Sequence, residues 1–248
     1  MSEKVLNARS EGVLWLAFNR PEKKNALDRE SYLALIGALD EARRDAAVRA
    51  VVFSGIGADF TAGNDLGDFR DFMEKPEDFP ALAFVRTLAA FEKPMVAAVA
   101  GDAVGVGATM LFHCDLVYAT PQARLRMPFI DLGLVPEAGA SLLVPRRFGM
   151  ARASQYLLAG EAFSGEDAFR LGLVNALAEP DAVLEMAMAA AKKLAQKPPA
   201  ALLAARRLMR GDPAEILARI DEEAALFAQA LASPTTRERL SAFFARGR

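Results

Sequence analysis

The sequence contains very little of the two residues that most often form cross-links or bind transition metals. Its 248 residues include one cysteine, Cys114, and one histidine, His113. A single cysteine cannot form a disulfide within the chain. A histidine-based metal site or a Ser-His-Asp triad would depend entirely on His113. We expect neither, and no metal site, because the segment around His113 and Cys114 is apolar and typical of a protein core.

The sequence also lacks long hydrophobic runs and an excess of charge of one sign. No run reaches the roughly 18 apolar residues of a membrane helix, and the first residues do not resemble a signal peptide. Apolar residues make up 53% and charged residues 25%, as in a globular protein. The net charge of −2 provides no field that would attract nucleic acid or an anionic membrane. We therefore expect a cytoplasmic enzyme with no nucleic-acid or membrane partner.

Apolar patterning predicts strands that alternate with helices in the first half of the chain. Asp28 is placed to cap a helix in which Leu33, Ile36 and Leu39 share one face. After about residue 137 the pattern is almost entirely helical. The predicted strands are 5–8, 13–18, 50–54, 95–100 and 115–119, and the later helices are 151–159, 165–171, 181–196, 199–210 and 213–232. This order predicts an α/β core with a parallel-rich sheet.

Two glycine-containing turns have the features of a binding site for a negatively charged oxygen. The first is residues 60–66, FTAGNDL, and the second is residues 101–109, GDAVGVGAT. A helix N-terminus has unpaired N–H groups, and glycine lets a ligand approach the backbone closely. Two such N–H groups directed at one point form an oxyanion hole, in which each donor is typically worth about 3–4 kcal/mol. Alone, the second turn is more typical of tight packing than of a site, and the first would pass as an ordinary turn. The second turn matches neither a P-loop nor a dinucleotide-binding fingerprint.

Taken together, these turns and several shorter motifs resemble the crotonase superfamily, the enoyl-CoA hydratases and isomerases. The resemblance extends from about Val13 to Phe148, with a weaker echo near the C-terminus. The matching motifs, in order, are Asn19-Arg20-Pro21, Asn25-Ala26-Leu27, Ala62-Gly63-x-Asp65, Lys93-Pro94, Ala98-Val99-x-Gly101 and Cys114-Asp115. This ordered set is highly specific for the family.

The resemblance implies a fold, a substrate and a set of site residues. The fold would be a crotonase-like α/β spiral of β-β-α turns, with the acyl-CoA site in residues 1–195 and a helical C-terminal trimerisation region in residues 196–248. The protein would form a homotrimer or a dimer of trimers. Coenzyme A would be part of the substrate, and no other cofactor is expected. The backbone N–H groups of Asn64 and Val106 would hold the thioester oxygen. The implied substrate-binding residues are Lys24, Ala26, Ala62, Gly63, Asp65, Leu66, Gly105 and Phe129.

Carboxylates distinguish the activities within this superfamily. Hydratases that resemble this chain carry two glutamates, whose positions are occupied here by Thr109 and Phe129. Glu137 remains, and it resembles the base of peroxisomal-type Δ3,Δ2-enoyl-CoA isomerases. We therefore expect Glu137 to be the catalytic base for conversion of 3-enoyl-CoA to 2-trans-enoyl-CoA. Alone, Glu137 would be read as a glutamate favoured by a helix N-terminus.

Other interpretations of the same sequence remain open. The protein could be an enoyl-CoA hydratase, or it could use the enolate for other chemistry in the same fold. It could also be a non-catalytic acyl-CoA-binding protein. Asp65 fits a role in tying its own loop better than a role in chemistry. Residues 68–80 are predicted to form a mobile surface loop or an irregular helix that becomes ordered when acyl-CoA binds.

Overall fold

The computed structural model describes residues 3–65, residue 67 and residues 80–246, with side chains described up to residue 242. The predicted binding residue Leu66 and the predicted loop 68–80, except for Pro80, lie outside the described residues.

A six-stranded sheet forms the centre of the molecule. Its strands are β1 (Val5–Ser10), β2 (Val13–Phe18), β3 (Ala50–Gly55), β4 (Met95–Val99), β6 (Leu116–Ala119) and β9 (Ala176–Leu177), in that spatial order. β1 and β2 form an antiparallel hairpin, and all the other neighbours are parallel. The predicted strands and the parallel-rich α/β core are therefore confirmed.

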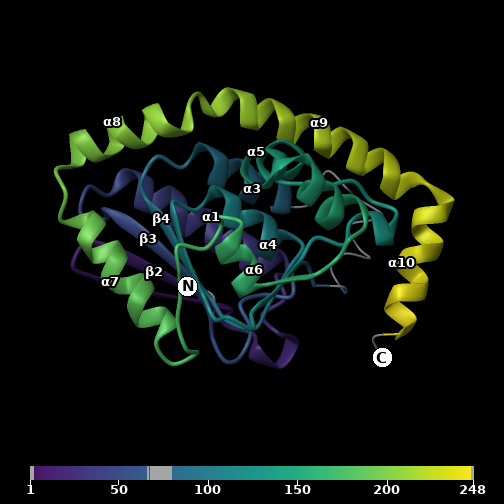
Figure 1. Cartoon of the computed structure of the whole chain (residues 1–248), viewed down its shortest axis with the longest axis horizontal. Helices are drawn as coiled ribbons and strands as arrows, with labels where there is room; N and C mark the ends of the chain where they lie inside the picture. The colour runs from purple at the N-terminus through teal and green to yellow at the C-terminus, as the bar shows by residue number, and fades with distance from the viewer. Residues whose placement is uncertain (1–2, 66, 68–79, 247–248) are drawn as a thin grey trace.

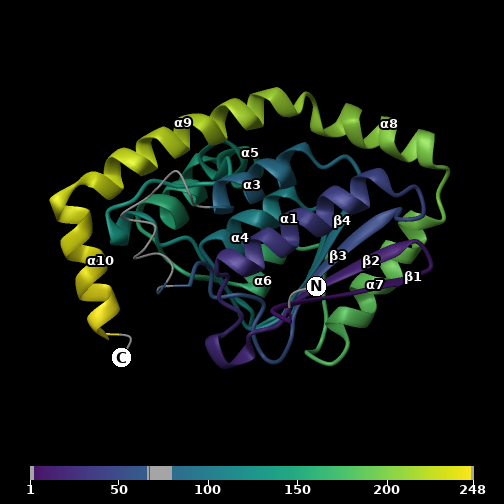
Figure 2. The same ribbon diagram turned by 180° about the vertical axis from the view of Figure 1, so that it is seen from behind.

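The inner strands β3 and β4 are buried on both faces of this sheet, as expected of strands that are apolar on both sides, whereas the edge strand β1 is largely exposed. Along β3, Val51 and Phe53 belong to the larger core cluster, whereas Ala50 and Val52 belong to a second cluster. The helices α1 (Arg29–Arg44) and α3 (Pro80–Ala90) contribute to the larger cluster, and α7 (Val183–Ala195) covers the opposite face. Figures 1 and 2 show α7 on the side of the sheet away from α1 and α3.

A second, smaller sheet was not predicted from the sequence patterns, and one of its strands lies within the second glycine turn. It consists of β5 (Asp102–Val104), β7 (Arg124–Arg126) and β8 (Phe163–Ser164). Two strands, β8 and β9, follow residue 137 in a half of the chain that is otherwise helical, as predicted. These strands contain only two residues each, so they are too short to show a period of two.

The C-terminal half is otherwise helical, but its first helix begins earlier than predicted. Helix α5 covers Ala140–Ala153 and is interrupted at Gly149, whose φ is 75°. Pro145 and this interruption obscure the helical periodicity. The predicted helix, 151–159, therefore includes only the last residues of α5. A π-helical segment at Ser154–Leu158 follows α5 and, with the end of α5, covers most of the predicted helix 151–159. The remaining α-helices of this half are α6 (Gly165–Arg170), α8 (Pro199–Arg210), α9 (Pro213–Ala232) and α10 (Pro234–Arg246).

Helices α8, α9 and α10 form an arch along one long edge of the molecule (Figures 1 and 2). Helix α10 turns back toward the body, where the hydroxyl of Thr236 donates to the Gly133 carbonyl at 2.9 Å. Leu240 on α10 is 1% exposed, so the body of the same chain buries this apolar residue. No helix among the described residues is long and apolar enough to cross a membrane.

Candidate functional site

The two glycine turns lie side by side and in register. Thr61 pairs with Ala103 in a parallel bridge, in which the Thr61 N–H donates to Asp102 at 3.0 Å and the Val104 N–H donates to Thr61 at 2.9 Å. Asn64 follows Thr61 by three residues, and Val106 follows Ala103 by the same number. The pairing therefore brings the two predicted oxyanion donors to matching positions on adjacent segments.

Close packing of these segments requires glycine at residue 63. A Cβ atom at Gly63 would lie 2.6 Å from the Val104 carbonyl oxygen, and the φ of Gly63 is 86°. A side chain at this position would push the two turns apart.

The Asn64 peptide is held by its neighbours. The Leu27 N–H donates to the Gly63 carbonyl at 2.8 Å, and the Asp65 N–H donates to the Leu27 carbonyl at 2.9 Å. These two bonds form a parallel bridge between Leu27 and Asn64, in which Asn64 directs its own N–H away from the Leu27 segment. Among the described residues, no acceptor is found for the Asn64 N–H.

The Val106 N–H is the first of a short helical turn, α4 (Val106–Thr109). The first N–H groups of a helix have no partner within the helix, and no other described residue accepts from Val106. Gly105 immediately before it has φ 56° and ψ −120°, a conformation that favours glycine. Two free N–H groups therefore lie at the ends of the paired turns, and such a pair can stabilise a developing oxyanion.

Glu137 is a partly buried carboxylate close to the Val106 turn. The Thr109 hydroxyl lies 3.5 Å from Glu137 Oε1 and 3.4 Å from the Val106 carbonyl oxygen. Burial, and next the negative charge of Glu223, raise the pKa of Glu137 to about 8, although the Thr109 hydrogen bond opposes this shift. A carboxylate with such a pKa is a competent proton acceptor near neutral pH.

The N-terminus of α5 is occupied by a different glutamate. Glu223 on α9 accepts hydrogen bonds from the N–H groups of Gly139 at 2.6 Å and Ser141 at 2.9 Å. Ala138 and Gly139 both have positive φ, 61° and 71°, so the chain turns sharply between Glu137 and the helix. Glu223, not Glu137, therefore binds the free N–H groups at the start of this helix.

A pocket of about 750 Å³ adjoins the paired turns. Phe227 of α9 and Leu240 of α10 also line it, and the sequence analysis had assigned neither to the site. Their positions depend on how the C-terminal arch folds back, which no local motif encodes. The predicted site residues that line the pocket are Lys24, Ala26, Ala62, Gly63, Asn64, Asp65, Gly105 and Phe129.

The side chain of Asp65 ties its own loop together, as expected. It pairs with Arg20 at 2.8 Å and with Lys23 at 3.3 Å, and it accepts from the Gly67 N–H at 2.8 Å. Burial alone would raise the pKa of Asp65, but the hydrogen bonds from Gly67 and Arg20 outweigh burial and lower it. Lys24 is more accessible, with 61% of its side chain exposed, and pairs with Asp102 at 2.8 Å.

An arginine-lined hollow lies next to this pocket and shares Ala62, Val104, Pro128 and Leu132 with it. Arg124, Arg126 and Arg239 line the hollow, and Arg126 pairs with Asp131 at 2.9 Å. An apolar pocket that continues into a cationic surface can accommodate an amphipathic anion.

His113 and Cys114 lie in the core, as predicted. The His113 ring is fully buried, and its Nε2 is 2.8 Å from the Ala138 carbonyl oxygen. Burial lowers the pKa of His113 to about 4 and raises the pKa of Cys114 to about 12. No group of three or more residues among those described is arranged to bind a metal ion.

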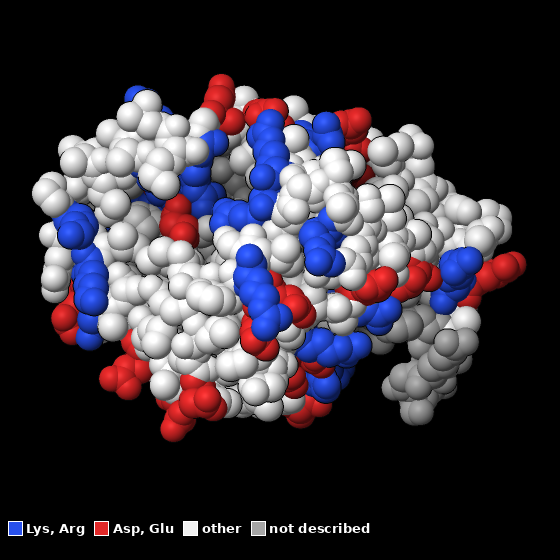
Figure 3. Space-filling model, viewed as in Figure 1, with Lys and Arg blue, Asp and Glu red and all other residues white. Residues whose placement is uncertain are grey.

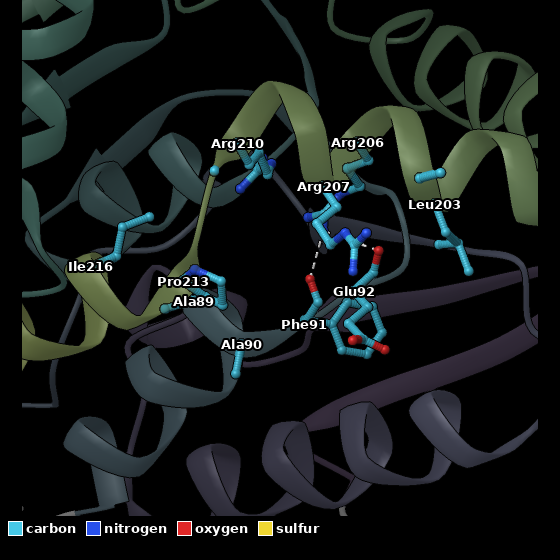
Figure 4. A pocket seen from close by; sticks show the side chains of 12 residues that line it. Ala89, Ala90, Phe91, Glu92, Leu203, Arg206, Arg207, Arg210, Pro213 and Ile216 are labelled. Atoms are coloured by element: carbon cyan, nitrogen blue, oxygen red, sulfur yellow. Dashed lines mark hydrogen bonds between the residues drawn. The ribbon is translucent and has the colours of Figure 1, made fainter.

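A further hollow, between α8 and the segment after α3, is separate from the site (Figure 4). Its arginines attach α8 to the body. Arg206 Nε contacts Asp115 at 2.9 Å, and Arg206 Nη1 donates to the Phe91 carbonyl at 2.7 Å. Arg206 Nη2 has no partner among the described residues, but it is fully enclosed, so an anion in the hollow would not reach it.

Comparison with known proteins connects this site to a family. The family described as Enoyl-CoA hydratase/isomerase matches residues 8–248. The chain is 35% identical to 2,3-dehydroadipyl-CoA hydratase of Escherichia coli (strain K12), over 98% of this chain and 96% of that protein. It is also 35% identical to enoyl-CoA delta isomerase 2 of Rattus norvegicus, over 90% of this chain and 58% of that protein.

Solved structures show the same fold. The structure of Pseudomonas aeruginosa OdaA superimposes with a TM-score of 0.93 at 45% identity, covering 98% of this chain and 99% of that chain. A putative enoyl-CoA hydratase/isomerase from Acinetobacter baumannii also gives 0.93, at 40% identity and with coverage of 98% and 99%. The predicted fold class is therefore confirmed.

Proposed function

Because the chain belongs to the enoyl-CoA hydratase/isomerase family, we propose that it moves a double bond, converting 3-enoyl-CoA to 2-trans-enoyl-CoA. The observation that supports this activity most strongly is the environment of Glu137. Its pKa is raised to about 8, and it lies beside Thr109, where the hydratase pattern has a glutamate. Phe129 occupies the other hydratase position and supplies no carboxylate. A single base is sufficient for this reaction because no water is added.

Glu137 removes a proton from C2, and the negative charge moves onto the thioester oxygen. The N–H groups of Asn64 and Val106 receive that oxygen, and their position in the paired turns exists before the substrate binds. Preorganised donors of this kind stabilise a developing charge by roughly 3–4 kcal/mol each. Glu137 then returns the proton at C4, which completes the migration of the double bond.

The pocket and the neighbouring arginines supply the substrate contacts. The acyl chain lies against Phe129, Leu134 and Phe227 in the apolar pocket. The phosphates of coenzyme A lie toward Arg124 and Arg239 in the arginine-lined hollow. Arg20 is a weaker candidate for a phosphate contact because it is only 12% exposed and pairs with Asp28 and Asp65.

Hydration is the second candidate function, and one comparison favours it. The Escherichia coli relative that is similar over almost the whole chain is named a hydratase. Water addition requires a carboxylate that positions and deprotonates water. Glu137 would have to perform this step alone, since Thr109 and Phe129 cannot.

We also propose that the protein assembles as a homotrimer or a dimer of trimers through its C-terminal arch. Leu208 and Met209 at the end of α8 are 80% and 87% exposed, which is unusual for large apolar side chains. Figure 3 shows a largely uncharged area at its upper left, over the first part of α8, although other parts of that face are uncharged too. Leu240 on α10 does not contribute to this exposed apolar surface, because its own chain buries it.

The substitution Glu137→Gln tests the proposed activity. It keeps the size of the side chain and removes its basicity, so isomerisation should fall by about 10²–10⁴-fold with little change in acyl-CoA affinity. Glu185→Gln, an exposed residue on α7, is the matched control and should be fully active. Isomerisation that is unaffected by Glu137→Gln would remove Glu137 from the mechanism. A natural protein that binds acyl-CoA without converting either enoyl isomer would be a binding protein.

A further inference from the structure

Tyr32 is a buried tyrosine whose hydroxyl reaches one of the two proposed oxyanion donors. It lies in the first turn of α1, it is 0% exposed, and its hydroxyl donates to the side-chain Oδ1 of Asn64. Tyr32 belongs to none of the motifs that identified the site. Its contact with Asn64 joins α1 to the first glycine turn across 32 residues of sequence.

The position of the Tyr32 ring is fixed by its surroundings. Its N–H donates to the Asp28 carbonyl at 3.0 Å, and its ring packs against Phe84 of α3 with a centroid distance of 5.5 Å. The Asp28 side chain caps the helix by accepting from the Ser31 N–H at 2.9 Å, and it is held by Lys4 at 2.7 Å. The hydroxyl is therefore presented to Asn64 by a rigid helix start.

Asn64 is consequently held on both the backbone and the side chain by the start of α1. Leu27 bonds the peptides on either side of Asn64, at 2.8 and 2.9 Å, and Tyr32 bonds its side chain. The Asn64 N–H lies in the same planar peptide as the Gly63 carbonyl, so the bond from Leu27 to that carbonyl sets the plane in which the N–H points. The Tyr32 bond holds the side chain on the Asn64 Cα atom, which joins this peptide to the next, and so restrains movement of Asn64 as a whole.

We propose that Tyr32 is a positioning residue, which holds Asn64 so that its backbone N–H points at the thioester oxygen. This inference rests on the proposed function, because it assumes that the Asn64 N–H stabilises an enolate. Burial, and next the charge of Glu137, raise the pKa of Tyr32 well above its ordinary value. The hydroxyl therefore stays protonated and remains a donor at the pH of catalysis.

The substitution Tyr32→Phe keeps the ring against Phe84 and removes only the hydroxyl. Loss of a complete oxyanion donor costs about 10²–10³-fold in kcat. Loosening a donor costs less, so we expect kcat to fall about 10- to 100-fold, with KM changed by less than about threefold. Tyr156→Phe removes a hydroxyl from another buried tyrosine, away from the site, and should leave kcat unchanged.

A double-mutant cycle distinguishes positioning from general stability. Asn64→Ala keeps the backbone N–H but removes the acceptor of the Tyr32 hydroxyl, so it should lower kcat to a similar extent. If Tyr32 acts through Asn64, the variant with both substitutions should be no slower than the slower single variant. Multiplied losses in the double variant would overturn the proposal. So would a Tyr32→Phe protein that melts at a lower temperature but has an unchanged kcat.

A second readout separates this inference from the proposed isomerisation. A 3-ketoacyl-CoA forms an enolate that absorbs in the near ultraviolet, and any oxyanion hole should increase its enolate fraction on binding. Tyr32→Phe should reduce that increase, whereas Tyr156→Phe should not. An unchanged enolate fraction in Tyr32→Phe would overturn the inference. If the natural protein shows the Tyr32-dependent increase but does not isomerise 3-enoyl-CoA, the proposed function fails and the inference stands.

Discussion

Replacing Glu137 with glutamine should stabilise the fold, and the gain should depend on pH. Folding raises the pKa of Glu137 from 4.5 to about 8, mainly because burial disfavours the charged form. Above pH 4.5 the unfolded chain loses this proton while the folded chain keeps it, so the folded state becomes progressively less favoured. The penalty is nearly absent below the unfolded pKa, grows as pH rises, and is complete above the folded pKa.

The size of the effect follows from the shift. Each pKa unit corresponds to 1.36 kcal/mol, so the penalty near pH 9 exceeds that near pH 5 by roughly 4 kcal/mol. Glu137→Gln removes the titrating group and should recover about that amount near pH 9 and little near pH 5. Denaturant unfolding of both proteins at the two pH values, at one fixed protein concentration, measures the difference. Equal stability changes at both pH values would refute the assignment of Glu137 as a partly buried group whose pKa is raised by folding.

Three further predictions follow from the site and the surface. The value of kcat/KM should rise with pH and level off above about pH 8, because Glu137 must be deprotonated to act as the base. Glu223→Gln should move this rise to lower pH, because it removes a negative charge that raises the pKa of Glu137. Gly105→Ala should lower kcat by more than about tenfold, because it strains a backbone with φ 56° next to Val106. Unfolding experiments should show a loss of only about 1–3 kcal/mol, because a Cβ there meets no atom within 4 Å. Leu208→Glu should shift the protein from trimer to monomer in light scattering, and a natural protein that is already monomeric at micromolar concentration would contradict the assembly proposal.

The sequence predicted those parts of the fold that depend on local pattern. Strands β1 and β2, the cap at Asp28 and the buried strands β3 and β4 follow from short-range periodicity and the choice of capping residue. The glycine turns were also predicted from local sequence. Gly63 and Gly105 adopt positive φ values that few other residues tolerate, so glycine itself marks both turns.

The parts that the sequence did not predict depend on contacts between distant segments. Glu223 is 82 residues from Ser141, whose N–H it binds, so no motif links them. The contact of Tyr32 with Asn64 depends on how α1 docks against the first glycine turn, and Phe227 enters the pocket only because the arch folds back over it. Short strands such as β8 gain their pairing from neighbours and not from their own two residues.

The most direct test of the proposed activity is to incubate the natural protein separately with 3-enoyl-CoA and with 2-trans-enoyl-CoA and to identify the products by mass spectrometry. Water addition increases the mass, whereas migration of the double bond does not, and chromatography separates the two enoyl isomers. We predict rapid conversion of 3-enoyl-CoA to the 2-trans isomer and slow formation of 3-hydroxyacyl-CoA from either substrate. Rapid hydration of 2-trans-enoyl-CoA, together with 3-enoyl-CoA that stays unchanged, would contradict the isomerase proposal and favour a hydratase.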